Sequence, residues 1–373
     1  MTTTAIVAVK DGDTLGAINC FLRSLLEKGA VQALLVPQRV AAGDNIVQTL
    51  VSDPKRLDAP DPISPVLPVQ SAKLVARITS SGPPGRVGVV LKSCEWRALV
   101  ELTKLKQARL DNVLTIGIDC LGTYEVEDFA ALSRRGISPT QQLLPQAWEG
   151  RLQPYEGFEF RTACQMCEYP VPTGTDVHIQ LLGTDLLDSV VIQAPDDVMA
   201  ALGLQGAEAP VQRDKVVQAL VAERAAARER LLEGLRAAVQ DMPALLAQFS
   251  TCLRCHNCMA ACPICYCKEC IFRGATFDHA SRQYFTWAQR KGAIRMPTDT
   301  LLFHLGRLNH MVASCVGCGL CSSACPVGLP VGTVFRAVGQ KVQAQFGYVP
   351  GKSLEDPLPL ATFREDELQD LGS

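Results

Sequence analysis

Apolar and polar residues alternate along the start of the chain in a pattern that predicts strands separated by helices. Ala5–Val9 is a short apolar run, and Thr14–Lys28 carries apolar residues at helical spacing until Gly29 ends the helix. A second apolar run, Val31–Val36, follows at once. This order predicts a βαβ unit at the start of an α/β domain.

The order of strand, helix and strand recurs further along the chain. Arg86–Leu91 predicts a buried strand, Glu95–Gln107 a helix, and Val113–Ile118 another strand. Ligands of parallel sheets bind outside the carboxyl ends of the strands. Cys94 and Cys120 each come just after a predicted strand, so we expect these two thiols to share a site.

The composition of the chain changes sharply after residue 210, and it predicts four segments. Residues 1–210 form an α/β domain with a mixed or parallel sheet. Residues 211–245 are rich in Ala, Leu, Glu and Arg and predict a helical connector. Residues 246–347 form a mostly α-helical, cysteine-rich domain. Residues 348–373 form an extended acidic tail, which we expect to pack on a neighbour or on the cysteine-rich domain.

Net charge, the lack of membrane or export signals, and the number of cysteines narrow the class of protein. The 373 residues carry a net charge of −2, so no basic field points to nucleic acid or to an anionic membrane. The N-terminal stretch lacks the pattern of a secretory signal, and no apolar run reaches the roughly 18 residues of a membrane span. These features predict a cytoplasmic protein. Sixteen cysteines in a reducing compartment favour metal binding.

Two cysteine runs share the spacing C-x2-C-x2-C-x3-C-P. In two-cluster bacterial ferredoxins this spacing holds 4Fe–4S clusters, and the fourth cysteine of each run binds the other cluster. The first predicted cluster therefore takes Cys252, Cys255, Cys258 and Cys325, and the second takes Cys315, Cys318, Cys321 and Cys262. Structural zinc is the alternative, but zinc sites favour two separated C-x2-C pairs.

The segment between the two runs is longer than a small ferredoxin needs. It spans 52 residues between Cys262 and Cys315, and residues 271–314 read as mostly helical. This segment resembles the C subunit of heterodisulfide reductase, a helical ferredoxin module. His304 and His310 are candidates for hydrogen bonds near cluster sulfurs, but we expect them to pack in or beside the helices and not to ligate iron.

A third set of cysteines is spread over three segments of the first domain. These segments are Ser93-Cys94-Glu95, Cys120-Leu121-Gly122-Thr123, and Cys164-x2-Cys167 followed by Asp176-Val177-His178 and Gly183. Over roughly residues 1–200, these motifs resemble the beta-subunit family of coenzyme F420 hydrogenases and formate dehydrogenases. The resemblance implies a third 4Fe–4S cluster on Cys94, Cys120, Cys164 and Cys167, beside an FAD that exchanges hydride with a deazaflavin or related carrier.

The flavin depends on this resemblance alone. No G-x-G-x-x-G follows a predicted strand, so no dinucleotide fingerprint supports it. Lys92, past the end of a predicted strand, is a candidate contact to flavin or phosphate, and an ordinary loop lysine is equally plausible. The chain also departs from the family, because its ferredoxin motif follows the flavin domain instead of preceding it.

Four cysteines remain outside these three sets. Cys20 lies on the first predicted helix, and we expect it to pack in the core. Cys265, Cys267 and Cys270 directly follow the first ferredoxin run. They predict either a further metal or cluster site, or a redox-active or shielding role beside the neighbouring cluster.

These patterns together predict an iron–sulfur oxidoreductase subunit that is catalytic only within a complex. It would relay electrons between a catalytic partner, of the formate dehydrogenase or hydrogenase alpha type, and a flavin or hydride carrier. The alternative is a flavin-free electron conduit that docks heterodisulfide-reductase-like subunits of a bifurcating complex. A zinc-stapled scaffold is a third, remote reading.

Overall fold

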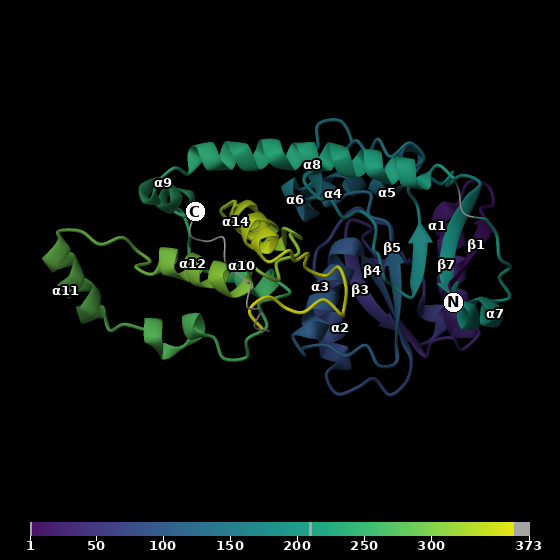
Figure 1. The fold of residues 1–373 in the computed structure, drawn as a ribbon, viewed down its shortest axis with the longest axis horizontal. Coiled ribbons are helices and arrows are strands. Elements are labelled where there is room, and N and C mark those ends of the chain that lie inside the picture. The colour runs from purple at the N-terminus through teal and green to yellow at the C-terminus, as the bar shows by residue number, and fades with distance from the viewer. Residues whose placement is uncertain (1, 209–210, 362–373) are drawn as a thin grey trace.

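The computed structural model describes residues 2–208 and 211–361. A sheet domain and a helical, cysteine-rich domain lie side by side, and one long helix runs along both of them (Figure 1). The long helix is α8, Arg213–Ala238, which lies in the predicted connector. The arrangement of an α/β domain followed by a mostly helical one confirms the predicted fold class.

The first domain is built on one sheet of seven strands, with the order β1-β7-β6-β5-β4-β2-β3. Strands β2, β4, β5 and β6 are parallel, whereas β1, β3 and β7 are joined to their neighbours by antiparallel pairing. The sheet is therefore mixed, with a parallel centre. The strands are β1 Thr2–Ala8, β2 Ala33–Arg39, β3 Ile46–Val51, β4 Val87–Lys92, β5 Val113–Ile118, β6 Val177–Gln180 and β7 Ser189–Pro195.

The strand, helix and strand predicted at the start of the chain are present, and β1 and β2 run parallel, but the two strands are not neighbours in the sheet. Strand β1 pairs with β7 at one edge of the sheet, whereas β2 lies between β3 and β4 near the other edge. Helix α1, Thr14–Glu27, therefore joins two strands that are not neighbours. An apolar run reports that a strand is buried but does not report which strand it pairs with, so periodicity alone could not place β1.

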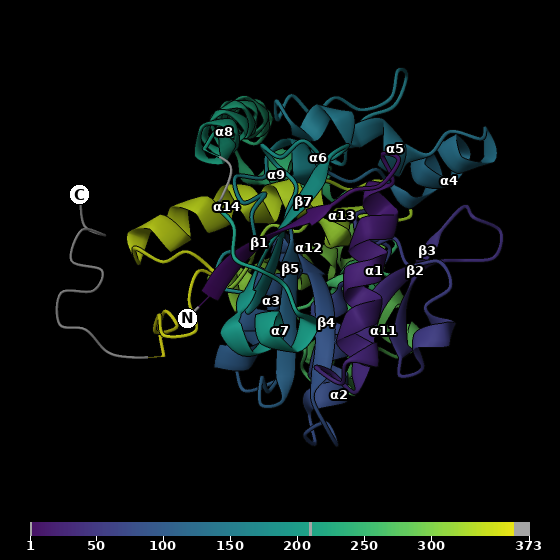
Figure 2. The ribbon, with the colours of Figure 1, turned by 90° about the vertical axis from the view of Figure 1, so that its right-hand side faces the viewer.

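Helices cover both faces of the sheet and give it two separate cores. Because side chains of a strand alternate between faces, Val90 of β4 faces the core that contains α1, while Val89 and Leu91 face the core beneath α2 and α3. Helices α2 and α3 are Ser71–Thr79 and Ser93–Lys104. Figure 2 shows α1 running along the sheet. Shorter helices complete this domain: α4 Val126–Arg134, α5 Pro139–Leu143, α6 Thr162–Gln165 and α7 Asp196–Leu202.

The second domain consists of short helices and the loops that carry the cysteine runs. The segment 271–314, which the sequence predicts to be mostly helical, contains two 3-10 turns and the helices α11 and α12. The helices are α9 Met242–Gln248, α10 Asn257–Ala261, α11 Ser281–Lys291, α12 Thr300–Met311, α13 Leu320–Ser323 and α14 Val331–Gln345. Within the described ranges, no helix combines the length and apolar character needed to cross a membrane.

A buried arginine of the sheet domain fastens the two domains together. Arg97, on α3, is 5% exposed and donates hydrogen bonds to the carbonyl oxygens of Pro350 (2.7 and 3.0 Å) and Val316 (3.2 Å). Its guanidinium also stacks 3.7 Å from the ring centre of Tyr169. Gly351 has φ +73° and approaches Arg97 so closely that a Cβ there would lie 2.4 Å from its carbonyl oxygen. This contact therefore requires glycine.

A buried carboxylate on the same helix binds the described part of the tail. Glu101 accepts hydrogen bonds from the Tyr348 hydroxyl (2.5 Å) and the Gly351 amide (2.8 Å), and it pairs with Lys104 (2.8 Å). The tail up to residue 361 thus begins on α3 of the first domain, rather than on the cysteine-rich domain alone. Residues 362–373 lie outside the described residues.

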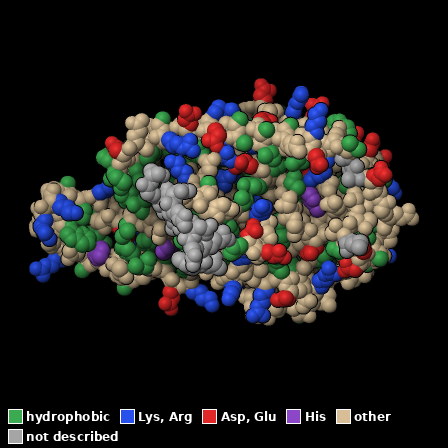
Figure 3. Space-filling model, viewed as in Figure 1, with side chains coloured by type: hydrophobic (Ala, Val, Ile, Leu, Met, Phe, Trp, Pro, Cys, Tyr) green, Lys and Arg blue, Asp and Glu red, His purple; other side chains and the backbone are tan. Residues whose placement is uncertain are grey.

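Charged side chains of both signs are interspersed on the face drawn in Figure 3. This distribution agrees with the net charge of −2 and shows no single-sign field on that face.

Candidate metal centres

The structure gathers the first predicted ligand set around α10 and the end of α13. Cys258 lies on α10 and is 7% exposed. Burial raises the pKa of its thiol, and the neighbouring thiols of Cys252, Cys325 and Cys255 raise it further. Cysteines separated by 67 residues in the chain, Cys258 and Cys325, are thus close enough to interact. This is the crossed pairing that the ferredoxin spacing predicts.

The second predicted set is gathered in the same way. Burial raises the pKa of Cys262 to about 12, and Cys318 and Cys315 raise it further. Burial also raises the pKa of Cys321, whose next contributors are Cys262, Cys318 and Cys315. Cys262, the last cysteine of the first run, therefore faces the three cysteines of the second.

The third set lies at the carboxyl ends of two neighbouring parallel strands. Cys94 begins α3 directly after β4, and Cys120 comes after β5. Burial raises the pKa of Cys120 to about 11, Cys164 raises it further and Lys92 lowers it. Burial likewise raises the pKa of Cys94, with Cys120 and Cys167 among its neighbours. The four cysteines that the family resemblance implies are thus brought together from three separate segments.

The spacing of the thiols is wider than that of ligands around one ion. In the described part of the chain, no three His, Cys, Asp or Glu side chains are close enough to hold a single metal ion. The ligands of a 4Fe–4S cluster each bind a different iron atom, so they stand around a larger volume. The assignment of these twelve cysteines to three clusters stays a prediction.

The loops that carry the two runs share a backbone conformation that suits a cluster. Arg254 and His256 flank Cys255 with φ of +51° and +65°, and Gly317 and Gly319 flank Cys318 with φ of +72° and +73°. A non-glycine residue in this region costs about 1–2 kcal/mol, so the first run holds a strained loop. Successive backbone N–H groups in such turns form concave sites for anions, including iron–sulfur clusters.

Buried polar atoms beside the first set lack partners within the protein. Within the described residues, Arg254 Nε and His256 Nε2 are buried and have no hydrogen-bond partner. An isolated buried donor is costly. Sulfur atoms of a cluster are hydrogen-bond acceptors that tune its potential, so the surroundings of this set fit such a group.

Two residues of α12 contact this set. The sequence pattern missed Arg307, whereas for His304 it offered a hydrogen bond near sulfur as the alternative to packing. The Arg307 guanidinium is 2% exposed and donates to Cys258 Sγ (3.0 Å) and to the Cys258 carbonyl (3.1 Å). His304 stacks on Phe249, as its predicted packing role requires, but its Nε2 also lies 3.3 Å from Cys252 Sγ. Burial, followed by the charge of Arg307, lowers the pKa of His304 to about 4, so this ring is neutral at pH 7.

A second buried arginine joins the third set to the second. Arg161 is 4% exposed and donates to the carbonyl of Cys318 (3.0 Å) and to the hydroxyl of Thr123 (3.3 Å). The Thr123 hydroxyl lies 3.0 Å from Cys164 Sγ. Cys318 is also the largest electrostatic contributor to the raised pKa of Cys94, after burial. The second and third sets therefore lie against each other across the domain boundary.

An ion-pair cluster fixes the strand end that carries Cys120. Asp119 is 2% exposed and accepts hydrogen bonds from the amides of Leu181 (2.9 Å) and Leu182 (3.0 Å). It also pairs with His178 (2.9 Å) and Arg213 (2.6 Å). Burial alone would raise the pKa of Asp119, but His178 and Arg213 hold it well below its usual range. His178 of the family motif thus helps to position the site.

Lys92, the candidate flavin contact, is buried at the end of β4. It is 6% exposed, and its ammonium group donates to the carbonyl of Pro62 (3.2 Å). A separate cavity of about 500 Å³ is lined by the end of β2, by β3 and by the loop after β3. Its charged lining residues are Arg39, Arg56, Asp53 and Asp58. Arg39 is linked to the loop before Pro62 through Asp61 (2.7 Å). The role of Lys92 toward a flavin stays a prediction.

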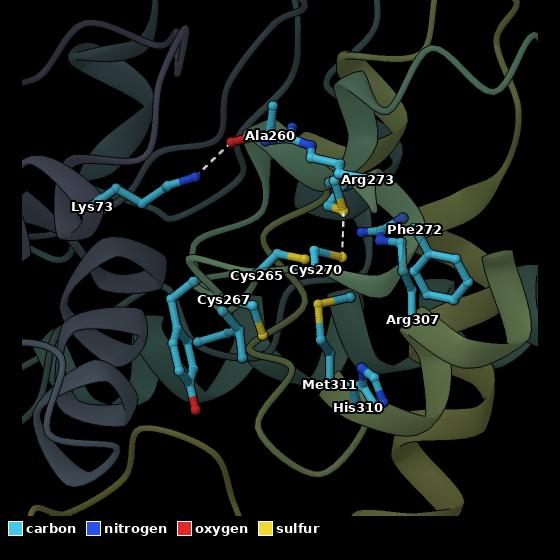
Figure 4. Close-up of a pocket in the computed structure, with 13 residues that line it drawn as sticks. Lys73, Ala260, Cys265, Cys267, Cys270, Phe272, Arg273, Arg307, His310 and Met311 are labelled. Atoms are coloured by element: carbon cyan, nitrogen blue, oxygen red, sulfur yellow. Dashed lines mark hydrogen bonds between the residues drawn. The ribbon is translucent and has the colours of Figure 1, made fainter. Parts of the chain in front are cut away.

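The four remaining cysteines divide into an exposed one and a cluster. Cys20 is exposed, so its predicted place in the core is wrong. The apolar stripe of α1 runs through Ile18, Leu22 and Leu25, which leaves position 20 on the other side. Three more cysteines line a cavity of about 440 Å³ beside α10 and α12 (Figure 4): Cys265, Cys267 and Cys270.

Comparison with known proteins agrees with these observations. Residues 248–329 match the family described as a 4Fe-4S dicluster domain. The chain is 25% identical over 376 residues to the F420-dependent formate dehydrogenase subunit beta of Methanocaldococcus jannaschii, covering 92% of this chain and 93% of the relative. It is 24% identical over 383 residues to the F420-dependent formate dehydrogenase 1 subunit beta of Methanococcus maripaludis, covering 94% of each chain.

Among solved structures, one similar chain comes from the F420-reducing [NiFe] hydrogenase complex of Methanosarcina barkeri, studied by xenon derivatization. The identity is 13% and the TM-score 0.44, with 65% of this chain and 94% of that chain covered. The curated relatives confirm the resemblance to the beta-subunit family and support an oxidoreductase subunit. The family match confirms iron–sulfur chemistry in the helical domain.

Proposed function

We propose that this chain is the electron-transfer beta subunit of a formate dehydrogenase-type complex, and that it holds three 4Fe–4S clusters and an FAD. Both curated relatives are named as F420-dependent formate dehydrogenase beta subunits and align with more than nine-tenths of the chain. The cysteine sets gathered in both domains supply the ligands for this role. In this proposal a catalytic alpha-type subunit is the partner.

The observation that carries the proposal is the contact between the second and third cysteine sets. Cys318 influences the thiol of Cys94 directly, and Arg161 spans the two sets. Arg97 holds the loop before Cys318 by its bond to the Val316 carbonyl. A two-cluster domain and a flavin domain that worked independently would not need a buried, cation-bridged junction of this kind.

When bound, the clusters carry single electrons, and the flavin exchanges pairs of electrons with a hydride carrier. The residues of the chain prepare the sites for these groups. The thiols of Cys94, Cys262 and Cys321 are partly buried, and this burial raises the pKa of each thiol. Arg161 and Arg307 place positive charge beside groups that become more negative on reduction.

The cavity beside β2 and β3 is where we place part of the FAD. Ligands of parallel sheets bind at the carboxyl ends of the strands, and the lining of this cavity includes Gln38 and Arg39, the last two residues of β2. Arg56 in its wall would pair with the pyrophosphate, beside Arg39, which already pairs with Asp61. Arg39 of the cavity wall pairs with Asp61, and the next residue, Pro62, accepts a hydrogen bond from Lys92. The charge of Lys92 in turn lowers the pKa of Cys120. A flavin there would thus lie on the side of the third cysteine set.

The catalytic partner would dock at the surface beside the first cysteine set. Cys255 is exposed, and Leu253 in the same loop is 61% exposed. Leu302 on α12 adds a further apolar side chain with 55% exposure. Apolar groups next to an accessible cluster ligand suit an interface through which electrons enter. Electrons would then pass from this surface, through the clusters of the helical domain, toward the sheet domain.

The double variant Cys94→Ser, Cys120→Ser tests the third cluster. We expect it to lose about four iron atoms per chain and to lose formate-driven reduction of the hydride carrier in the assembled complex. The clusters of the helical domain should still be reduced, because their ligands are untouched. Iron analysis, combined with rapid-mixing spectroscopy of the complex, measures both effects.

Cys20→Ser is the matched control, because it removes an exposed cysteine that belongs to none of the three sets. It should leave iron content and carrier reduction unchanged. An unaltered iron content in the double variant would contradict the third cluster. Extraction of the iron-replete native protein tests the flavin separately. If no FAD is released, the chain is a flavin-free conduit.

A further inference from the structure

A cavity in the helical domain is lined by the three cysteines that the ferredoxin runs leave over. It has a volume of about 440 Å³ and lies between α10, the loop that follows Cys262, and α12. Figure 4 shows the side chains of Cys265, Cys267 and Cys270 grouped on one side of it, with Met311 and Arg307 reaching in from α12. The volume falls within the range of ligand sites in proteins.

The three thiols form a compact group in both sequence and space. They follow the spacing C-x-C-x2-C, and all three are free thiols. The electrostatic neighbours of the Cys265 thiol include both Cys267 and Cys270. Cys265 and Cys270 are half-buried, whereas Cys267 is exposed. The group thus spans the distance from the interior of the cavity to its mouth.

The wall of the cavity is cationic. Lys73, Arg273 and Arg307 all line it, and none of its described lining residues is Asp or Glu. Lys73 comes from α2 of the sheet domain, and its ammonium group donates to the carbonyl of Ala260 on α10 (2.6 Å). Three cations around three ionisable thiols match the negative charge that metal-bound thiolates bring.

We propose that Cys265, Cys267 and Cys270 hold an additional 4Fe–4S cluster, with one iron atom that this chain does not ligate through cysteine. A cluster fits better than a single ion, because the three thiols extend from the interior of the cavity to its mouth. In the described ranges, no three potential ligands converge closely enough for one ion. The cluster would be delivered preassembled on the thiolates of a carrier protein, so that three carrier Fe–S bonds break as three Fe–S bonds to this chain form, the protons of the three thiols pass to the departing carrier thiolates, and no oxidation state changes.

The proposed site lies next to the first two cysteine sets. Arg307 lines the cavity and also donates to Cys258 of the first set. Cys262 of the second set precedes Cys265 by only three residues. The fourth iron would face the cavity, where a small anionic or thiol ligand can reach it from the exposed side of Cys267. The ligand set does not depend on the proposed formate dehydrogenase role.

The triple variant Cys265→Ser, Cys267→Ser, Cys270→Ser tests this site in the full chain, purified without oxygen. We expect wild type and variant to differ by about four iron and four sulfide per chain. Cys20→Ser, with its exposed cysteine outside the cavity, is the matched control and should retain all iron. The comparison is a difference between variants, so it holds whether or not the third cluster or the FAD is present.

Equal iron content in the wild type and a folded triple variant would overturn the proposal, as would the loss of one zinc in place of iron. A second measurement on the wild type covers the case in which the triple variant does not fold. Cyanide added to the reduced wild-type protein should bind the iron without a cysteine ligand and shift one electron paramagnetic resonance signal. A spectrum that cyanide leaves unchanged would contradict a cluster with an accessible iron.

Discussion

Arg307→Met should lower the reduction potential of the cluster on Cys252, Cys255, Cys258 and Cys325 by an amount on the order of 100 mV. Arg307 is buried and donates directly to Cys258 Sγ at 3.0 Å. Burial disfavours its charge, but the surrounding thiols raise the pKa of Arg307, so the guanidinium stays charged. Reduction adds a negative charge beside this cation. Two unit charges about 4 Å apart interact by about 4 kcal/mol at an effective dielectric constant of 20.

Redox titration followed by electron paramagnetic resonance measures this shift. Methionine is unbranched and flexible, so it fills the space of the arginine stem while the charge and the hydrogen bonds are lost. Arg307→Lys is the matched variant, because it retains the charge and loses the forked geometry. We expect Arg307→Lys to shift the potential by less than Arg307→Met does. A potential that rises, or that stays the same in both variants, would show that Arg307 only fills space.

Asp119→Asn should destabilise the sheet domain by about 3–5 kcal/mol, the usual cost of breaking a buried ion pair. Asp119 binds Arg213, His178 and two backbone amides, all from segments distant in the chain. Asparagine fills the same space but leaves the buried Arg213 without its counter-charge. Because Cys120 is the next residue, we also expect the iron of the third set to be lost more readily. Thermal unfolding should show a melting temperature lower by roughly 10 °C.

Glu149→Gln is the matched control for this variant. Glu149 also pairs with an arginine, Arg151, at 3.7 Å, but the two side chains are 64% and 84% exposed. Solvent screens such a pair, so neutralising it should leave the melting temperature unchanged. Equal melting temperatures for Asp119→Asn and the wild type would mean that the buried network does not hold the end of β5 in place.

The sequence predicted the parallel centre of the sheet, because its strands are continuous apolar runs. The runs at residues 86–91 and 113–118 became β4 and β5 within one residue. The edge strands were harder to predict. Strand β3, Ile46–Val51, has exposed positions such as Val47 and Leu50, so its pattern resembles a surface loop. The partner of β1 lies almost 190 residues away in β7, and no local pattern encodes such a pairing.

Cysteine spacing and family motifs predicted how the candidate ligands group. Neither of them predicted the cations that surround these ligands. Arg307 lies 49 residues from Cys258 in the sequence. Arg161 comes shortly before Cys164, but it reads as an ordinary polar position. One signal was available. Gly317 and Gly319 of the second run align with Arg254 and His256 of the first, and all four have positive φ. Comparing the two runs position by position would have predicted strained, ligand-facing loops in the first.

The central claim is that the cysteine set of the sheet domain and the second set of the helical domain form neighbouring clusters on one electron path. Electron paramagnetic resonance of the fully reduced protein measures this most directly. Cys94 and Cys318 lie close enough to interact, so the two reduced clusters should show magnetically coupled, broadened signals. The variant Cys94→Ser, Cys120→Ser should restore narrow signals from the helical domain. A wild-type spectrum equal to the sum of isolated, uncoupled clusters would contradict the account.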